Sequence, residues 1–82
     1  MHMSLLSVML MVEGEVPKKN IEKLVKPHSF EVTSDAILID PDKKLYTYIL
    51  EGPKEKYNEL DNDVKKAKGY QLFSDPKIDA FD

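Results

Sequence analysis

The segment Asp40-Pro41-Asp42 places two carboxylates two positions apart between two runs of strand-forming residues. Loop carboxylates suit Ca²⁺, which takes about six to eight oxygen ligands and accepts irregular geometry. A plain hairpin bend uses the same residues, because proline fixes φ and aspartate hydrogen-bonds to the backbone of a turn. The glycine and the distant glutamate of an EF-hand loop do not follow. We therefore interpret Asp40 and Asp42 as a hairpin bend, with cation binding as the alternative.

Four further carboxylates stand close to the ends of predicted strands. The strands expected at 4–12 and 45–50 are each followed by a helix, which favours the same direction for both strands. Strands with a common direction would bring the carboxylates to one pole of the sheet, where their mutual repulsion favours a bound cation. Ca²⁺ fits such a site, and Mg²⁺ would fit it with more retained water. The four residues are Glu13, Glu15, Asp35 and Glu51.

Three of these carboxylates also have an explanation without a metal. Glu13, Glu15 and Glu51 stand just before predicted helices. Negative charge beside a helix N-terminus is favoured by about 0.3 to 1 kcal/mol per group, because the helix dipole is positive there. The sequence leaves both explanations open.

Groups for acid–base or nucleophilic catalysis are sparse. His28 is the one imidazole outside the opening Met-His-Met, which has the composition of a cloning remnant, and it stands at a predicted helix-to-strand joint. A histidine there commonly caps a helix or faces water. Asp61 and Asp63 are two positions apart on a predicted helix, so we expect them on a solvated face. Without a cysteine, a catalytic triad or a phosphate-binding glycine loop, the chain is not expected to be an enzyme.

Hydrophobic spacing predicts the elements that position these residues. One helix is expected to begin at Pro17, whose missing N–H needs no partner in a first turn, and Gly69 suits the left-handed cap of a second helix. Short apolar or alternating runs predict the strands. Helices are expected at 17–26 and 57–67, and strands at 4–12, 30–33, 36–39, 45–50 and 70–73, with 30–33 and 36–39 paired as a hairpin.

This order of elements, β-α-β-β-β-α-(β), predicts an α+β fold in two layers. Two helices are expected to pack on one face of a mixed, largely antiparallel sheet. The 82 residues suffice for one domain, in which residues 70–82 form an edge strand or a tail.

A two-layer fold leaves one face of the sheet without helices. Met9 and Met11 point to that face if the alternate residues of the first strand face the helices. The strand at 45–50 must add one of two sets of side chains, Tyr46 and Tyr48 or Leu45 and Ile49. Methionine and tyrosine are enriched in binding surfaces. The candidate surface for a second copy or another protein comprises Met9, Met11, Tyr46 and Tyr48; the alternative is that the segment 70–81 covers this face.

Composition limits the classes of partner. All twelve basic residues are lysine, and the formal net charge is −3. Arginine supplies the planar fork that grips phosphates and base edges, so its absence argues against nucleic-acid binding. No apolar run approaches the roughly 20 residues that span a bilayer. Small extracellular domains commonly contain disulfides, so we expect this cysteine-free chain to be cytoplasmic.

Length, composition and turn sequence together resemble a known group of proteins. The chain lacks cysteine and arginine, is rich in lysine, glutamate, aspartate and isoleucine, and has the acidic turn Asp40-Pro41-Asp42 beside short strands. In these features it resembles the small acidic α+β proteins of methanogenic archaea for which calcium binding has been proposed. The resemblance implies a cytoplasmic protein that binds a divalent cation, and it assigns no ligand to a position.

Two functions of different classes follow as expectations. The first is a non-catalytic protein that binds Ca²⁺ through Glu13, Glu15, Asp35 and Glu51, with Asp40 and Asp42 as the competing site. The second is a protein-interaction module, either a homodimer or an adaptor subunit, that uses the sheet face without helices.

Overall fold

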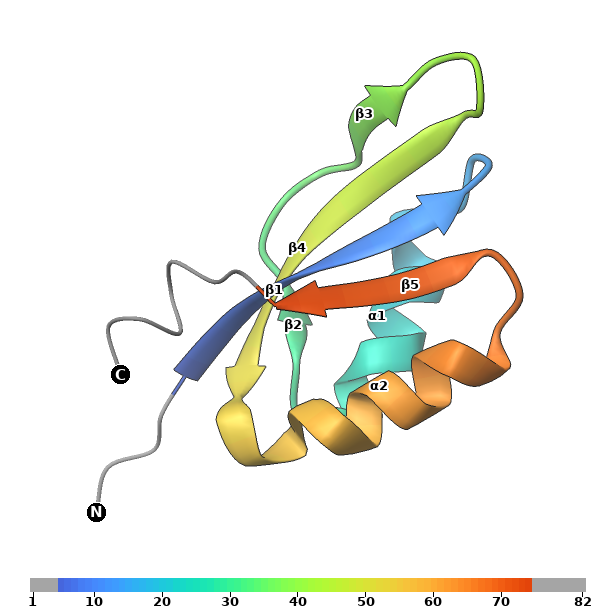
Figure 1. Cartoon of the computed structure of the whole chain (residues 1–82). Coiled ribbons are helices and arrows are strands. Elements are labelled where there is room, and N and C mark those ends of the chain that lie inside the picture. The colour runs from blue at the N-terminus through green and yellow to red at the C-terminus, as the bar shows by residue number, and fades with distance from the viewer. Residues whose placement is uncertain (1–4, 75–82) are drawn as a thin grey trace.

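The computed structural model describes residues 5–74, which form a sheet of five strands and two α-helices (Figure 1). The strands are β1 (Leu5–Glu13), β2 (Glu31–Val32), β3 (Ile37–Asp40), β4 (Leu45–Pro53) and β5 (Tyr70–Ser74). The helices are α1 (Lys18–Val25) and α2 (Tyr57–Lys66), accompanied by the 3₁₀ turns η1 (Lys26–His28) and η2 (Lys54–Lys56). The predicted two-layer α+β fold is confirmed. The expected cloning remnant and the end of the predicted tail, 75–82, lie outside the described residues.

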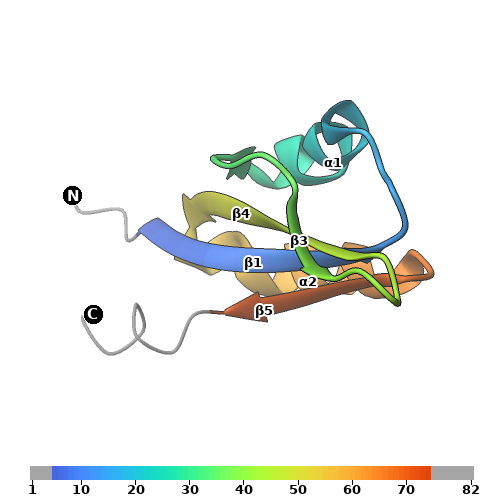
Figure 2. The same cartoon turned by 90° about the horizontal axis from the view of Figure 1, so that it is seen from above.

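Within the described residues, all neighbouring strands of the sheet are antiparallel, in the order β2-β4-β1-β5. Figure 2 shows β1 between β4 and β5. β1 pairs with β4 from Leu5 opposite Pro53 to Glu13 opposite Leu45. The predicted common direction of these two strands is therefore wrong. The reason is that α1 returns the chain to an edge of the sheet, and a hairpin then reverses it before β4 pairs with β1.

β2 and β3 lie along the same edge of β4, and both are antiparallel to it. They run in the same direction, so the predicted hairpin between them is wrong. Between them, Thr33 N–H donates to the Ile49 carbonyl at 2.8 Å, while Ser34 Oγ accepts Ile49 N–H at 2.9 Å. Counted as one interrupted strand, β2 and β3 complete the β-α-β-β-α-β connectivity of ferredoxin-like folds.

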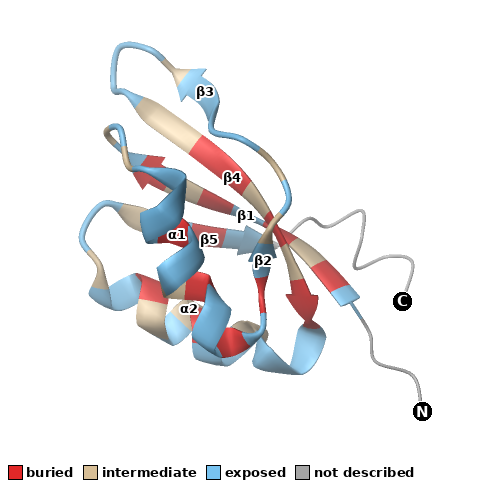
Figure 3. Ribbon diagram, turned by 180° about the vertical axis from the view of Figure 1, so that it is seen from behind, coloured by how far each residue is buried: buried red, intermediate tan, exposed pale blue. Residues whose placement is uncertain are grey.

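Both helices pack on one face of the sheet, because alternate residues of β1 are apolar on that side. These residues are Leu6, Val8, Leu10 and Val12, all buried. The helices add Ile21 and Val25 from α1 and Leu60 and Val64 from α2. Figure 3 shows the buried positions on the inner sides of the helices and on the strands, and shows β3 exposed. Burial of each large apolar side chain contributes about 1.5 to 3 kcal/mol, which holds the two layers together.

The helices end close to the predicted positions. α1 follows Pro17 and passes into η1 at Lys26. α2 ends at Lys66, and Gly69 has φ 87° in the turn that follows. Glycine adopts this left-handed region without the steric cost that a Cβ imposes. The turn returns the chain along β1, so the predicted edge strand at 70–73 is present as β5.

Candidate functional site

The four carboxylates predicted to gather at one pole do not meet. Glu13 lies opposite Leu45 at one end of the β1–β4 ladder, whereas Glu51 lies opposite Ser7 near the other end. Leu45 and Glu51 are six positions apart on β4, a separation of roughly 20 Å along an extended strand. The prediction is wrong because it assumed that β1 and β4 run in the same direction.

Glu15 and Asp35 lie at the end of the sheet where α1 begins, but each has a partner of its own. The Tyr46 hydroxyl donates to Glu15 Oε1 at 3.4 Å. Lys18 Nζ lies 3.6 Å from Asp35 Oδ1, and both side chains are substantially exposed. Across residues 5–74, no three histidine, aspartate or glutamate side chains are placed to hold one metal ion. Calcium binding therefore stays a prediction without an assembled site in this part of the chain.

Asp40 forms the hairpin bend that its sequence context favours. Its Oδ1 accepts the N–H groups of Asp42 and Lys43 at 3.0 and 3.3 Å. The chain then enters β4 at Leu45, which pairs with Asp40 across a bulge. A carboxylate oxygen that accepts two backbone N–H groups closes the turn without a cation. The alternative role of Asp40 and Asp42 as cation ligands stays a prediction.

The sheet face opposite the helices carries Met9 and Met11, as predicted. Tyr46 and Tyr48 lie on the other face, so their assignment to the binding surface is wrong. Tyr48 is only 2% exposed, and its hydroxyl donates to the Val16 carbonyl at 2.9 Å. Burial raises the pKa of Tyr48, with a smaller contribution from the negative charge of Asp35. Because side chains alternate between the two faces along β4, the alternative pair, Leu45 and Ile49, lies on the same face as the methionines.

Cross-strand pairing joins the apolar side chains of this face into one patch, here called the open sheet face. Met9 lies opposite both Ile49 and Phe73. Met11 lies opposite Thr47, which in turn lies opposite Ile37. The apolar side chains of the open sheet face are Leu5, Met9, Met11, Ile37, Leu45, Ile49 and Phe73. Four of these are substantially exposed: Leu5 57%, Met9 39%, Ile37 45% and Phe73 36%.

The adjoining strand β3 is apolar on both sides. Leu38 and Ile39 are about as exposed as Ile37, at 50% and 49%. β3 lies at the edge of β4, beyond the part of the sheet that the helices cover (Figure 1). The large apolar side chains that are exposed among the described residues thus all belong to strands.

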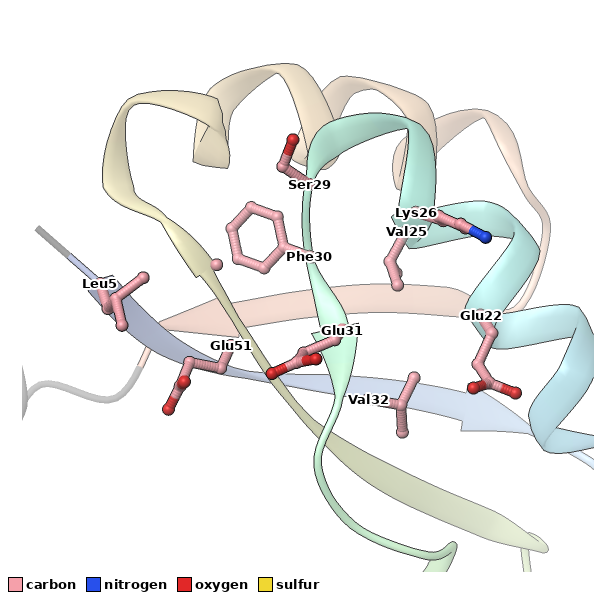
Figure 4. A pocket seen from close by; sticks show the side chains of 10 residues that line it. Leu5, Glu22, Val25, Lys26, Ser29, Phe30, Glu31, Val32 and Glu51 are labelled. Carbon is pink, nitrogen blue, oxygen red and sulfur yellow. The ribbon is translucent and has the colours of Figure 1, made fainter. Parts of the chain in front are cut away.

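A groove of about 570 Å³ lies between α1 and the β2–β4 edge (Figure 4). The ring of Phe30 forms part of its floor and covers Gly52, where an added Cβ would lie 2.5 Å from a ring carbon. Three carboxylates surround the groove, those of Glu22, Glu31 and Glu51. Glu31 and Glu51 lie directly opposite each other on β2 and β4, where like charges are mildly destabilising.

His28 is buried against α2, so the expectation that it caps a helix or faces water is wrong. It is only 7% exposed, at the end of η1. Its Nδ1 lies 2.7 Å from Glu59 Oε2, and its Nε2 lies 2.6 Å from Asp63 Oδ2. Neutral imidazole has one N–H donor, so the second nitrogen would face a carboxylate oxygen with no proton between them. The geometry, in which both ring nitrogens lie at hydrogen-bond distance from a carboxylate oxygen, therefore fits the imidazolium ion.

The ionisation of these three groups is coupled. Burial of the ring lowers the pKa of His28, but the hydrogen bonds with Glu59 and Asp63, aided by their negative charges, outweigh it and the net pKa is raised. The hydrogen bond from His28, followed by the charge of Lys56, lowers the pKa of Glu59. The hydrogen bond from His28 likewise lowers the pKa of Asp63.

One signal in the sequence pointed to this cluster. Glu59 and Asp63 are four positions apart, so they share one side of α2, next to the buried stripe that contains Leu60 and Val64. Asp61 and Asp63 are only two positions apart, a spacing that separates side chains on a helix and that predicted a solvated face instead. What the spacing could not reveal is that η1 packs against this side of α2.

Comparison of the chain with protein-family models and with curated proteins finds no match. In the described part of the chain, neither α-helix has the length and apolar character needed to cross a membrane.

Proposed function

We propose that this protein is a non-catalytic interaction module that associates with a second copy of itself through the open sheet face. The observation that supports the proposal is the continuous apolar patch formed by Phe73, Met9 and Ile49 across three adjacent strands. Apolar patches of several hundred Å² on soluble proteins commonly mark interfaces. Methionine suits such a surface because its flexible side chain adapts to a partner.

The charge pattern favours a second copy as the partner. The centre of the open sheet face is uncharged, so two copies can bring their centres together without opposing like charges. On this face the acidic side chains of β1 and β4 stand toward the two ends of the ladder, at Glu13 and Glu51. A partner with a strongly basic face would find no complementary charge at the centre.

The size of the sheet is consistent with a weak homodimer. About 30 strand residues, spaced about 3.3 Å along each strand and 4.8 Å between strands, project roughly 460 Å² per copy. Two copies together would cover roughly 900 Å² of projected sheet, before the added relief of side chains, which is below the roughly 1,200 Å² of standard interfaces and in the range of weak, transient complexes. We therefore expect a concentration-dependent dimer.

The substitution Met9→Asp tests the proposal because it places a charge at the centre of the patch. We expect sedimentation velocity to show a dimer that dissociates on dilution for the wild type, and a monomer for Met9→Asp at every concentration. Asn20→Asp, on the exposed surface of α1, makes the same change in net charge away from the patch and should dimerise as the wild type does.

A wild-type protein that stays monomeric at millimolar concentration would refute the homodimer. A chain that ends at Ser74 distinguishes two explanations for a monomeric wild-type protein. If the shortened chain dimerises where the full chain does not, residues 75–82 compete for the face. If both remain monomeric, the open sheet face does not mediate self-association.

A further inference from the structure

His28 joins the connection between α1 and β2 to the second helix. η1 is a short turn, and Ser29, which follows it, has φ 63°, in the left-handed region that residues other than glycine rarely adopt. Within the connection, Ser29 N–H donates to the Lys26 carbonyl and Phe30 N–H donates to the Val25 carbonyl. The two ring contacts of His28 then fix this strained segment to α2.

We infer that His28 is a proton-dependent latch between η1 and α2, built from the side chains His28, Glu59 and Asp63. With the ring protonated, each nitrogen donates to one carboxylate. When the ring loses one proton to water, a nitrogen lone pair faces a carboxylate oxygen at hydrogen-bond distance. One of the two attractive contacts becomes repulsive, and the latch releases. The inference does not rest on the proposed dimerisation, because Met9, Ile49 and Phe73 at the centre of the open sheet face are not among the residues that line the groove.

The charges around the ring come from four elements. α2 presents Glu59 and Asp63, each of which directs one oxygen to the ring. Lysines approach the other oxygen of each carboxylate: Lys56 Nζ of η2 lies 3.8 Å from Glu59 Oε1, and Lys66 Nζ lies 3.8 Å from Asp63 Oδ1. α1 and η1 carry exposed Glu22, Lys23 and Lys26 nearby in the sequence. The ring proton therefore completes a chain of alternating charges, lysine, carboxylate, imidazolium, carboxylate and lysine.

Release of the latch is expected to act on the groove in Figure 4. Lys26, Ser29 and Phe30 line the groove, and all three lie within two residues of His28. The Phe30 ring in turn covers Gly52 of β4. Loss of one proton from the buried His28 ring is therefore expected to reduce the order of the groove wall formed by Lys26, Ser29 and Phe30.

The test is amide hydrogen exchange of the full chain, followed from about pH 5 to about pH 9 and corrected for the intrinsic rate. We expect the protection factors of the Ser29 and Phe30 amides to fall by about tenfold or more as the ring deprotonates, the effect of losing one charge-assisted hydrogen bond. The amides of Val8 and Leu10 in the centre of the sheet serve as internal controls and should show a smaller change.

Asp63→Asn is the decisive variant. Its amide can donate a hydrogen bond to an unprotonated nitrogen, so the bridge persists without the second proton. We expect its protection factors at Ser29 and Phe30 to vary little over the same pH range. Equal pH dependence in the wild type and in Asp63→Asn would overturn the latch, as would a wild type without pH dependence at these amides. Glu59→Gln repeats the test at the other nitrogen if Asp63→Asn does not fold.

The protonation state of the His28 ring can also be measured directly, without any substitution in α2. Two-dimensional ¹H–¹⁵N spectra of the imidazole distinguish the doubly protonated ring from either neutral form. The signals of His2 are those that remain in His28→Gln. We expect the His28 ring of the wild type to titrate above the ordinary value of 6.5. A ring that titrates at or below that value would contradict a latch held by two donated bonds.

Discussion

Gly52 lies under the ring of Phe30, and this contact accounts for the absence of a side chain at the position. A Cβ there would lie 2.5 to 2.8 Å from three ring atoms, closer than real Cβ atoms approach other atoms. We expect Gly52→Ala to lower the free energy of unfolding by about 1 to 3 kcal/mol, because overpacking forces neighbouring groups to shift. Urea unfolding monitored by circular dichroism measures the change.

Two further variants separate the clash from other effects of alanine. Gly52→Ala combined with Phe30→Leu should lose less stability than the sum of the single changes, because the smaller side chain makes room for the methyl group. Lys19→Ala, on the exposed surface of α1, should change stability by less than about 0.5 kcal/mol. Strict additivity of the two core changes would show that Gly52 and Phe30 are not coupled.

Side-chain direction at the level of single residues was partly predictable. Met9 and Met11 follow from strand alternation, because buried and exposed positions alternate along β1. For β4 the same alternation allowed two answers, and Ile49 rather than Tyr48 faces the methionines. Both sets of β4 side chains are apolar or aromatic, so the pattern carried no preference. Packing of Tyr48 under the helices, with its hydroxyl bonded to Val16, decided the matter.

At the scale of elements, the β3–β4 hairpin depends on one carboxylate. Asp40→Ala removes the acceptor of two backbone N–H groups, so we expect it to lower the free energy of unfolding by about 0.5 to 1.5 kcal/mol. Asp40→Asn keeps an acceptor oxygen and should be close to the wild type. Equilibrium urea unfolding of both variants provides the measurement.

Asp42 supplies the matched control for this hairpin. It is exposed, and in the turn it contributes its backbone N–H. We expect Asp42→Ala to leave stability nearly unchanged. Equal losses for Asp40→Ala and Asp42→Ala would indicate that the two carboxylates act together, as the alternative of a shared cation requires.

The pairing of the elements was harder to predict than the elements themselves. Each predicted helix and strand exists close to its predicted range, because local apolar spacing, proline and glycine determine where elements begin and end. The direction of β4 relative to β1 depends instead on whether the chain reverses between β2 and β3, and here these two strands run in the same direction along β4. That choice is made by packing between residues distant in sequence, which no local pattern contains.

At the scale of the whole molecule, the cluster around His28 gives stability a dependence on pH. The pKa of His28 is raised above 6.5, so its contribution is complete below pH 6.5 and is lost as pH rises through the folded pKa. The pKa values of Glu59 and Asp63 are lowered from 4.5 and 3.8, so their contribution is complete above pH 4.5 and is lost as pH falls through the folded values. We expect the cluster to stabilise the fold most between these limits.

The urea midpoint measured across the pH range tests this expectation. The wild type should have its highest midpoint between pH 4.5 and 6.5 relative to His28→Gln, with the difference narrowing on both sides. Glutamine keeps a polar side chain but cannot carry the charge. A constant difference between the two proteins would show that the ring contributes through packing alone.

The sequence by itself determined the fold class, the positions of the elements and the side chains of β1 that lie on the open sheet face. These depend on the spacing of apolar residues, on Pro17 and on Gly69, all of which act over a few neighbouring positions. The tertiary structure alone decided that Glu13 and Glu51 lie far apart and that His28 meets Glu59 and Asp63. Strand direction and the packing of η1 on α2 depend on how the whole core is buried. Contacts between residues that are distant in sequence therefore cannot be predicted from any short segment.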